Sequence, residues 1–250
     1  PAANRKQLKA SEKKLLKQHQ RAWLGDLAMF LIDAKGPQLS YYRDCTYHHT
    51  FARGFLDSLT IGALLPDFSR VLKQPQHARL LRRLVIHGLP RGWDFEDDEA
   101  YAEGTWEGDS VPGIVELAGT KFTNLRHFEL SGGDSSLSAQ GIENLIKNMP
   151  NLEVLHLEAH DVATGQLFRT KLPKLRSLTI DHMWDYPLEL LAKNKSLTNL
   201  ESIAFWPHAI DPGEEAAYIS FEGFKAMCRS KNLPKLRYLK LMCADIGNEG

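Results

Sequence analysis

An apolar triplet with the spacing Leu-x-x-apolar-x-apolar recurs seven times along this chain and limits what the chain can fold into. The triplets are Leu56-Leu59-Ile61, Leu81-Leu84-Ile86, Leu125-Phe128-Leu130, Leu152-Leu155-Leu157, Leu175-Leu178-Ile180, Leu200-Ile203-Phe205 and Leu236-Leu239-Leu241. Their first leucines lie 25, 44, 27, 23, 25 and 36 residues apart. A unit of this length cannot bury its apolar face alone, so neighbouring units are expected to stack and share one continuous core.

The residues around the triplets also repeat. Five triplets share a lead-in: Thr123-Asn124-Leu125, Pro150-Asn151-Leu152, Pro173-Lys174-Leu175, Thr198-Asn199-Leu200 and Pro234-Lys235-Leu236. Apolar residues at helical spacing follow Ser138 and Ser220, and each serine is placed to cap a helix by accepting a backbone N–H. The pattern therefore predicts that each unit contains a strand, a loop, a helix and a turn.

These repeats resemble leucine-rich repeats, most closely the long, helix-bearing ribonuclease-inhibitor type, over roughly residues 53–250. The asparagine or cysteine usual after the strand is mostly replaced, by Gly133, His160, Trp184 and His208, while Cys243 occupies that place once. The resemblance implies an α/β solenoid: a horseshoe with a curved parallel β-sheet, outer helices and a helical N-terminal cap.

Residues 1–24 carry seven Lys or Arg side chains and a single acid, Glu12. Leu8, Leu15, Leu16 and Trp23 fall close to one helical face. We expect a basic amphipathic helix that covers the open N-terminal end of the solenoid, within a cap that spans residues 1–52. A membrane-surface or nucleic-acid role is the alternative for this helix.

A second resemblance concerns the junction between this segment and the repeats. Residues 15–27 followed by 51–56 are similar to the junction in certain bacterial leucine-rich-repeat proteins of planctomycetes and myxobacteria. In those proteins a short repeat-companion domain precedes the repeats. The resemblance implies that residues 1–52 include the tail of such a region, and that family has no established catalytic activity.

Two intervals between triplets are long enough to hold inserts. The first contains an acidic insert, 92–113, with eight Asp or Glu and no Lys or Arg, and the second contains an insert at 207–217. The acidic insert is expected to be a solvated loop, with a bound cation or a basic partner protein as alternatives. Residues 246–250 resemble the start of another repeat's helix, so we expect a truncated solenoid whose uncapped C-terminal end self-associates.

Composition and motifs exclude several classes of function. The 31 basic and 31 acidic residues cancel, which gives no indication of nucleic-acid binding, and no apolar run is long enough to span a membrane. Three cysteines far apart indicate a reducing compartment, and we expect a cytoplasmic location. Cys45, His48 and His49 fall short of a four-ligand zinc site. Since nucleophile, phosphate-loop and metalloprotease motifs are absent, we expect no enzyme activity, cofactor or metal.

What remains is the concave face of the predicted sheet. Strand alternation places three rows of residues there, which begin at Arg83, Val85 and His87. We predict a protein-binding surface made of Arg83, His87, His127, Glu129, His156, Glu158, Thr179, Asp181, Trp206, Tyr238, Lys240 and Met242. Three alternatives stay open: a solvated sheet face without a ligand, a structural spacer, and a specificity or regulatory arm of a larger enzyme or metal-dependent regulator.

Overall fold

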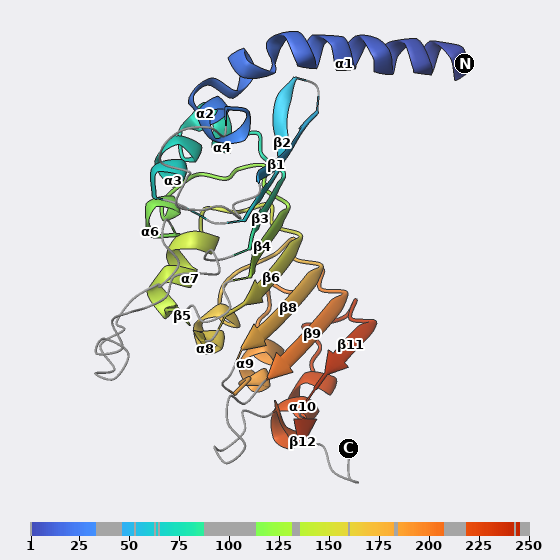
Figure 1. Ribbon diagram of the computed structural model, residues 1–250. Helices are drawn as coiled ribbons and strands as arrows, with labels where there is room; N and C mark the ends of the chain where they lie inside the picture. The colour runs from blue at the N-terminus through green and yellow to red at the C-terminus, as the bar shows by residue number, and fades with distance from the viewer. Residues whose placement is uncertain are drawn as a thin grey trace.

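An open, mostly parallel β-sheet of eight strands forms the body of the protein, with helices along one of its faces (Figure 1). The computed structural model describes residues 2–33, 47–52, 54–62, 64, 66–87, 114–131, 136–159, 161–182, 185–207, 219–242 and 244–245. The strand order is β1-β2-β3-β4-β6-β8-β9-β11. These strands are β1 (Tyr47–Ala52), β2 (Phe55–Ile61), β3 (Arg83–Ile86), β4 (His127–Ser131), β6 (Val154–Glu158), β8 (Ser177–His182), β9 (Ser202–Pro207) and β11 (Tyr238–Leu241).

The seven triplets predicted as strands are all confirmed, from β2 to β11. Each of these strands pairs in parallel with the next, and equivalent triplet positions lie opposite each other, as Leu84 does Phe128 and Leu155 does Leu178. Two small parallel sheets, β5 (Ser136–Leu137) with β7 (Asp161–Val162) and β10 (Ile219–Ser220) with β12 (Ala244–Asp245), lie further along the units.

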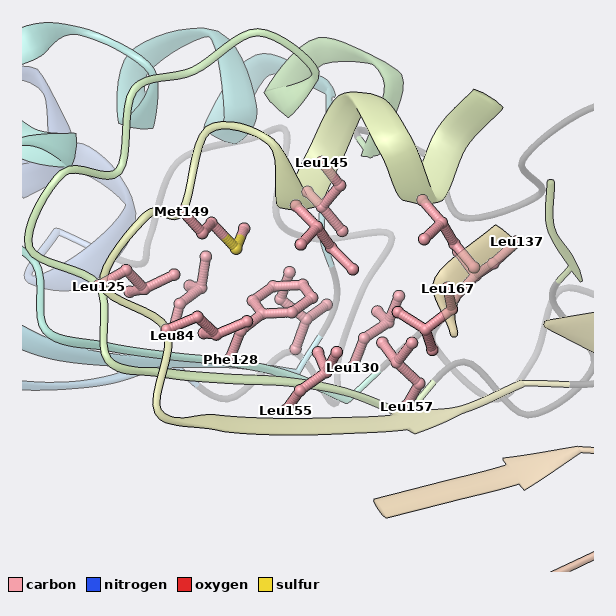
Figure 2. Packing of buried hydrophobic residues seen from close by; sticks show 14 of the residues in the cluster. Leu84, Leu125, Phe128, Leu130, Leu137, Leu145, Met149, Leu155, Leu157 and Leu167 are labelled. Atoms are coloured by element: carbon pink, nitrogen blue, oxygen red, sulfur yellow. The ribbon is translucent and has the colours of Figure 1, made fainter. Parts of the chain in front are cut away.

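The core lies between the sheet and the helices, where the triplets of successive units share it. Figure 2 shows Leu84, Phe128, Leu130 and Leu155 pointing from the strands toward side chains of the opposing helix layer, with Leu145 above them. The last two apolar positions of each triplet from β2 to β9 are at most 2% exposed. In β11 the equivalent Leu239 is 38% exposed, because the described chain places no further strand beside it.

The helices are short and occupy the second half of the units. They are α3 (Pro66–Leu72), α4 (Pro75–Ala78), α6 (Ile114–Leu117), α7 (Ala139–Ile146), α8 (Thr164–Leu167), α9 (Leu188–Lys193) and α10 (Phe221–Cys228). The two predicted serine caps are confirmed: Ser138 Oγ accepts from Gly141 N at 3.1 Å, and Ser220 Oγ from Gly223 N at 3.2 Å. These hydroxyls occupy backbone donors that the first helical turn leaves without an intrahelical acceptor.

At the N-terminus, α1 (Ala2–Leu24) forms the predicted helix but covers the sheet with its C-terminal end only. Figure 1 shows α1 crossing the end of the β1–β2 hairpin and projecting past the sheet on the side away from the helices. Leu8 is 65% and Leu15 49% exposed, whereas Leu24 is buried. The short η1 (Gly25–Leu27) and α2 (Ala28–Leu31) complete the cover, because Leu27 and Phe30 reach the core.

Residues 47–52 differ from the helical or loop structure expected of the N-terminal cap. They form β1, which pairs antiparallel with β2 and extends the sheet across the expected boundary at residue 52. Tyr47 stacks on Phe68 with ring centroids 5.2 Å apart, so an aromatic contact with α3 holds the strand at this edge. The backbone groups of β2 thereby gain partners that a helix would not supply.

Several predictions fall outside the described residues. They are the acidic insert at 92–113, the insert at 207–217 beyond Pro207, the C-terminal residues 246–250, Cys45, and the post-strand positions Gly133, His160, Trp184, His208 and Cys243. Among the described helices, none has both the length and the apolar character that crossing a bilayer requires.

Candidate functional site

Parallel pairing aligns the predicted surface residues into three rows on the sheet face opposite the core, which we call the row face. The first row runs through Arg83, His127, Val154, Ser177, Ser202 and Tyr238, and the second through Val85, Glu129, His156, Thr179, Ala204 and Lys240. In the third row Ser131, Glu158, Asp181 and Trp206 pair directly, while His87 and Met242 follow the ends of β3 and β11. The sequence therefore predicted this alignment correctly.

Glu129 is the centre of a polar cluster in the first half of the row face. Its Oε2 lies 3.3 Å from His127 Nε2 and 3.8 Å from Arg83 Nη2, and its Oε1 lies 3.6 Å from His156 Nδ1. Arg83 Nη1 also donates to Thr60 Oγ1 at 3.4 Å. Three strands that are adjacent in the sheet thus direct one carboxylate, one guanidinium and two imidazoles toward a common point.

The cluster is half-buried, and burial affects the protonation of His127. Burial lowers the pKa of His127; the charges of Arg83 and His156 act in the same direction, while the hydrogen bond and charge of Glu129 oppose them. The lowered pKa favours a neutral His127, which takes part in the cluster as a hydrogen-bonding group.

The far end of the row face has a different, largely aromatic and apolar character. Lys240 Nζ lies 4.8 Å from the centroid of the Trp206 ring, a cation–π contact between neighbouring strands. Tyr238 is 53% and Met242 46% exposed, so both present large side chains to solvent. Aromatic and methionine side chains are enriched in protein interfaces, so the composition of this end is the most typical of a protein-binding surface.

The middle of the row face is acidic. Glu158 and Asp181 lie side by side in the third row, and Thr179 lies beside His156 in the second. Val85 and Ala204 in the second row are 1% and 7% exposed, so those two positions contribute little contact area. Burial is the main cause that raises the pKa of Tyr186, and the charge of Asp181 acts in the same direction. The Tyr186 hydroxyl donates to the Ile180 carbonyl at 3.0 Å.

A set of ion pairs between units was missed by the sequence analysis. Arg82 pairs with Asp57, Arg126 with Glu153 at 3.0 Å, and Arg176 with Glu201 at 2.8 Å, while Arg237 also pairs with Glu201. The hydrogen bond from Arg237, followed by the bond and charge of Arg176, lowers the pKa of Glu201. The signal was present in the sequence, since each of these residues directly follows the first leucine of a triplet.

In the part of the chain that the structure describes, no three His, Cys, Asp or Glu residues are arranged to hold a metal ion. His48 and His49 lie in β1, and Cys228 is a free, exposed thiol in α10.

No protein-family model matches the chain, and no curated protein matches it significantly. The fold and the row face define an open α/β protein with a continuous side-chain surface across parallel strands.

Proposed function

We propose that this chain is a leucine-rich-repeat solenoid that acts as a non-enzymatic protein–protein interaction module. The row face is then the concave face of the solenoid, and it binds a protein partner. The observation that carries the proposal is the alignment of side chains from six successive parallel strands, β3 to β11, into uninterrupted rows. Stacked repeats commonly use such an extended face for binding.

The chemistry of the face supports a protein ligand over a small molecule. Trp206, Tyr238 and Met242 offer large contact areas at one end, and the Glu129 cluster offers fixed hydrogen-bonding groups at the other. A partner that spans both ends would place its anchors on the aromatic side chains and its polar groups on the cluster.

The experiment compares three forms of the chain in affinity capture from lysate of the source organism, followed by mass spectrometry. The first is the wild type, and the second carries His156→Ala, Trp206→Ala and Tyr238→Ala. The third is a matched control with Leu15→Ala, Lys171→Ala and Lys193→Ala, which removes exposed side chains that lie outside the strands of the row face. We expect a protein that the wild type and the control retain and the row-face variant loses.

Other outcomes would contradict the proposal. A partner that all three folded forms retain would place binding outside the row face. If no form captures a specific protein, the chain acts as a spacer or as an arm of a larger protein whose chemistry lies elsewhere. Purification of the captured partner then allows its affinity to be measured, and we expect the row-face variant to lose at least about tenfold, since interface aromatics dominate binding energy.

A further inference from the structure

A pocket of about 630 Å³ opens on the helix side of the molecule, away from the row face. It lies where the turn after α3 and the helix α4 meet the segment that leaves α6, and Figure 1 shows these three helices close together. Its volume falls in the range of roughly 300–1,000 Å³ that is usual for small-molecule sites. Pro75, Ala78 and Ala118 give it an apolar wall.

The charged side chains of this pocket all have the same sign. Lys73 and Arg79 come from the α3–α4 region, and Lys121 comes from the segment after α6, whereas none of the lining residues is acidic. Arg79 and Lys121 form no ion pair with any carboxylate in the described part of the chain. Two separate segments thus bring three cations to one concavity, which favours a ligand with more than one negative charge.

A buried hydroxyl without a partner lies in the same wall. Thr120 is 6% exposed, and its Oγ1 forms no hydrogen bond within the described structure. Both backbone polar groups of Thr120 form hydrogen bonds: Thr120 N donates to the Leu117 carbonyl at 2.9 Å, and the Thr120 carbonyl accepts from Phe122 N at 3.1 Å. A buried hydroxyl in this state is costly, but Oγ1 is shielded from solvent, so the exposed cations rather than this hydroxyl face a ligand.

The backbone around the pocket holds these groups in place. The carbonyl of Arg79 accepts Asn124 Nδ2 at 2.7 Å and Thr123 Oγ1 at 3.4 Å, which ties α4 to the segment after α6. Gly119 ends α6 with a φ of +83°, and a Cβ built there would meet no atom within 4 Å. The left-handed glycine therefore turns the chain into the pocket wall and leaves its mouth open.

We propose that this pocket binds a phosphate group, either free or esterified to a small molecule. A phosphate carries a charge of about −2 and three acceptor oxygens, which match the side chains of Arg79 and Lys121. The apolar wall accommodates the organic part of a phosphate ester. This site is separate from the proposed protein-binding face, so either proposal stands if the other fails.

Isothermal titration calorimetry of the full chain with three probes tests this site: inorganic phosphate, glucose 6-phosphate and ATP. Glucose and adenosine serve as controls that lack phosphate. We expect saturable binding of at least one phosphate-bearing probe, absent with the two controls and weakened by added salt. Tighter binding of the esters than of inorganic phosphate would identify a phosphorylated small molecule as the ligand; equal binding would identify the free anion.

Two variants locate the binding. Arg79→Gln with Lys121→Gln should weaken binding by at least about tenfold, since both charge-assisted hydrogen bonds are lost. The matched control, Lys171→Gln with Lys193→Gln, removes two exposed lysines elsewhere and should bind as the wild type does. Thr120→Val removes a hydroxyl that is shielded from the pocket, so phosphate binding should stay unchanged while the unfolding midpoint of the free protein stays the same or rises.

Three results would overturn the proposal. The first is the absence of saturable binding for all three phosphate-bearing probes. The second is equal binding by the wild type and a folded Arg79→Gln/Lys121→Gln variant. The third is a loss of binding in the Lys171→Gln/Lys193→Gln control as large as that in the Arg79→Gln/Lys121→Gln variant, which would indicate attraction to surface charge in general.

Discussion

Lys235 Nζ donates to Asn199 Oδ1 at 2.6 Å, and through this contact one unit of the sheet is joined to the next. Asn199 in turn donates from Nδ2 to the Pro173 carbonyl of the preceding unit at 2.8 Å. The same arrangement occurs earlier, where Lys174 bonds to Asn151 and Asn151 Nδ2 donates to the Thr123 carbonyl at 2.6 Å. The Asn or Lys that precedes five of the seven triplets thus connects successive units along the turns.

Asn199→Ala should destabilise the protein because it removes both contacts and leaves the Pro173 carbonyl without its amide donor. We expect a loss of about 1–2 kcal/mol in the free energy of unfolding, measured by urea denaturation. The control is Asn144→Ala, which removes an exposed contact to Lys147 within α7 and should change stability by less than about 0.5 kcal/mol. Equal effects of the two substitutions would contradict a connecting role for Asn199.

Leu155→Ala and Leu239→Ala change the same position of two different units. Leu155 is fully buried in β6, whereas Leu239 is 38% exposed in β11. Because truncation of a buried leucine leaves a cavity, we expect Leu155→Ala to cost about 2–5 kcal/mol and Leu239→Ala much less. Urea unfolding of both variants measures the difference, and similar costs would show that the core extends past β11.

The exposed strand β11 should make the protein associate with itself. Leu239 lies exposed in an edge strand, and such strands pair readily with other chains. We expect the mass measured by size-exclusion chromatography with light scattering to rise with concentration, and Leu239→Lys to suppress that rise. A wild-type protein that stays strictly monomeric at high concentration would disprove the expectation.

Stability should fall as the pH is lowered, because three histidines are harder to protonate in the folded protein. Burial is the main cause that lowers the pKa of His77 from its ordinary value of 6.5, and the nearby charge of Asp26 only partly opposes it. Burial likewise lowers the pKa values of His49 and His127. Below about pH 6.5 the unfolded chain takes up these protons first, so the free energy of unfolding decreases from that pH downward.

Urea denaturation between about pH 7.5 and about pH 5.5 measures this effect. His77 is 3% exposed, so His77→Gln removes a buried titrating group and should flatten the pH dependence. The absolute stability of the variant does not matter for this comparison, because the readout is the slope with pH. An unchanged slope would show that His77 does not contribute.

The repeated triplets alone predict the strands from β2 to β11 and their alignment. The alternation within each triplet places Leu84 and Ile86, or Leu155 and Leu157, on the core side, and a shift by one residue would expose them all. Parallel units with equivalent core positions can therefore align in only one way. This is why the sequence predicts the three rows correctly, whereas the Ser138 and Ser220 caps follow from a serine placed before apolar residues at helical spacing.

Which of the aligned side chains meet depends on the packed structure. His127 and Glu129 lie two residues apart on β4, and His156 lies beside Glu129 on β6, but the contacts between their side-chain atoms depend on rotamers that no periodicity encodes. The strand β1 was also not predicted. Residues 47–52 lack the triplet pattern, and their strand structure depends on pairing with β2 and on the contact of Tyr47 with Phe68 from α3.

Dependence on packing also explains why the sequence did not predict how far α1 projects or where the pocket lies. The pattern of Leu8 and Leu15 predicts a helix, but it cannot fix the length over which that helix touches the sheet. The pocket brings Arg79 and Lys121 together from segments that are 42 positions apart in the printed sequence, 79 to 121. Local patterns repeat along a chain and can be counted, whereas contacts between separate segments exist only once the units have packed.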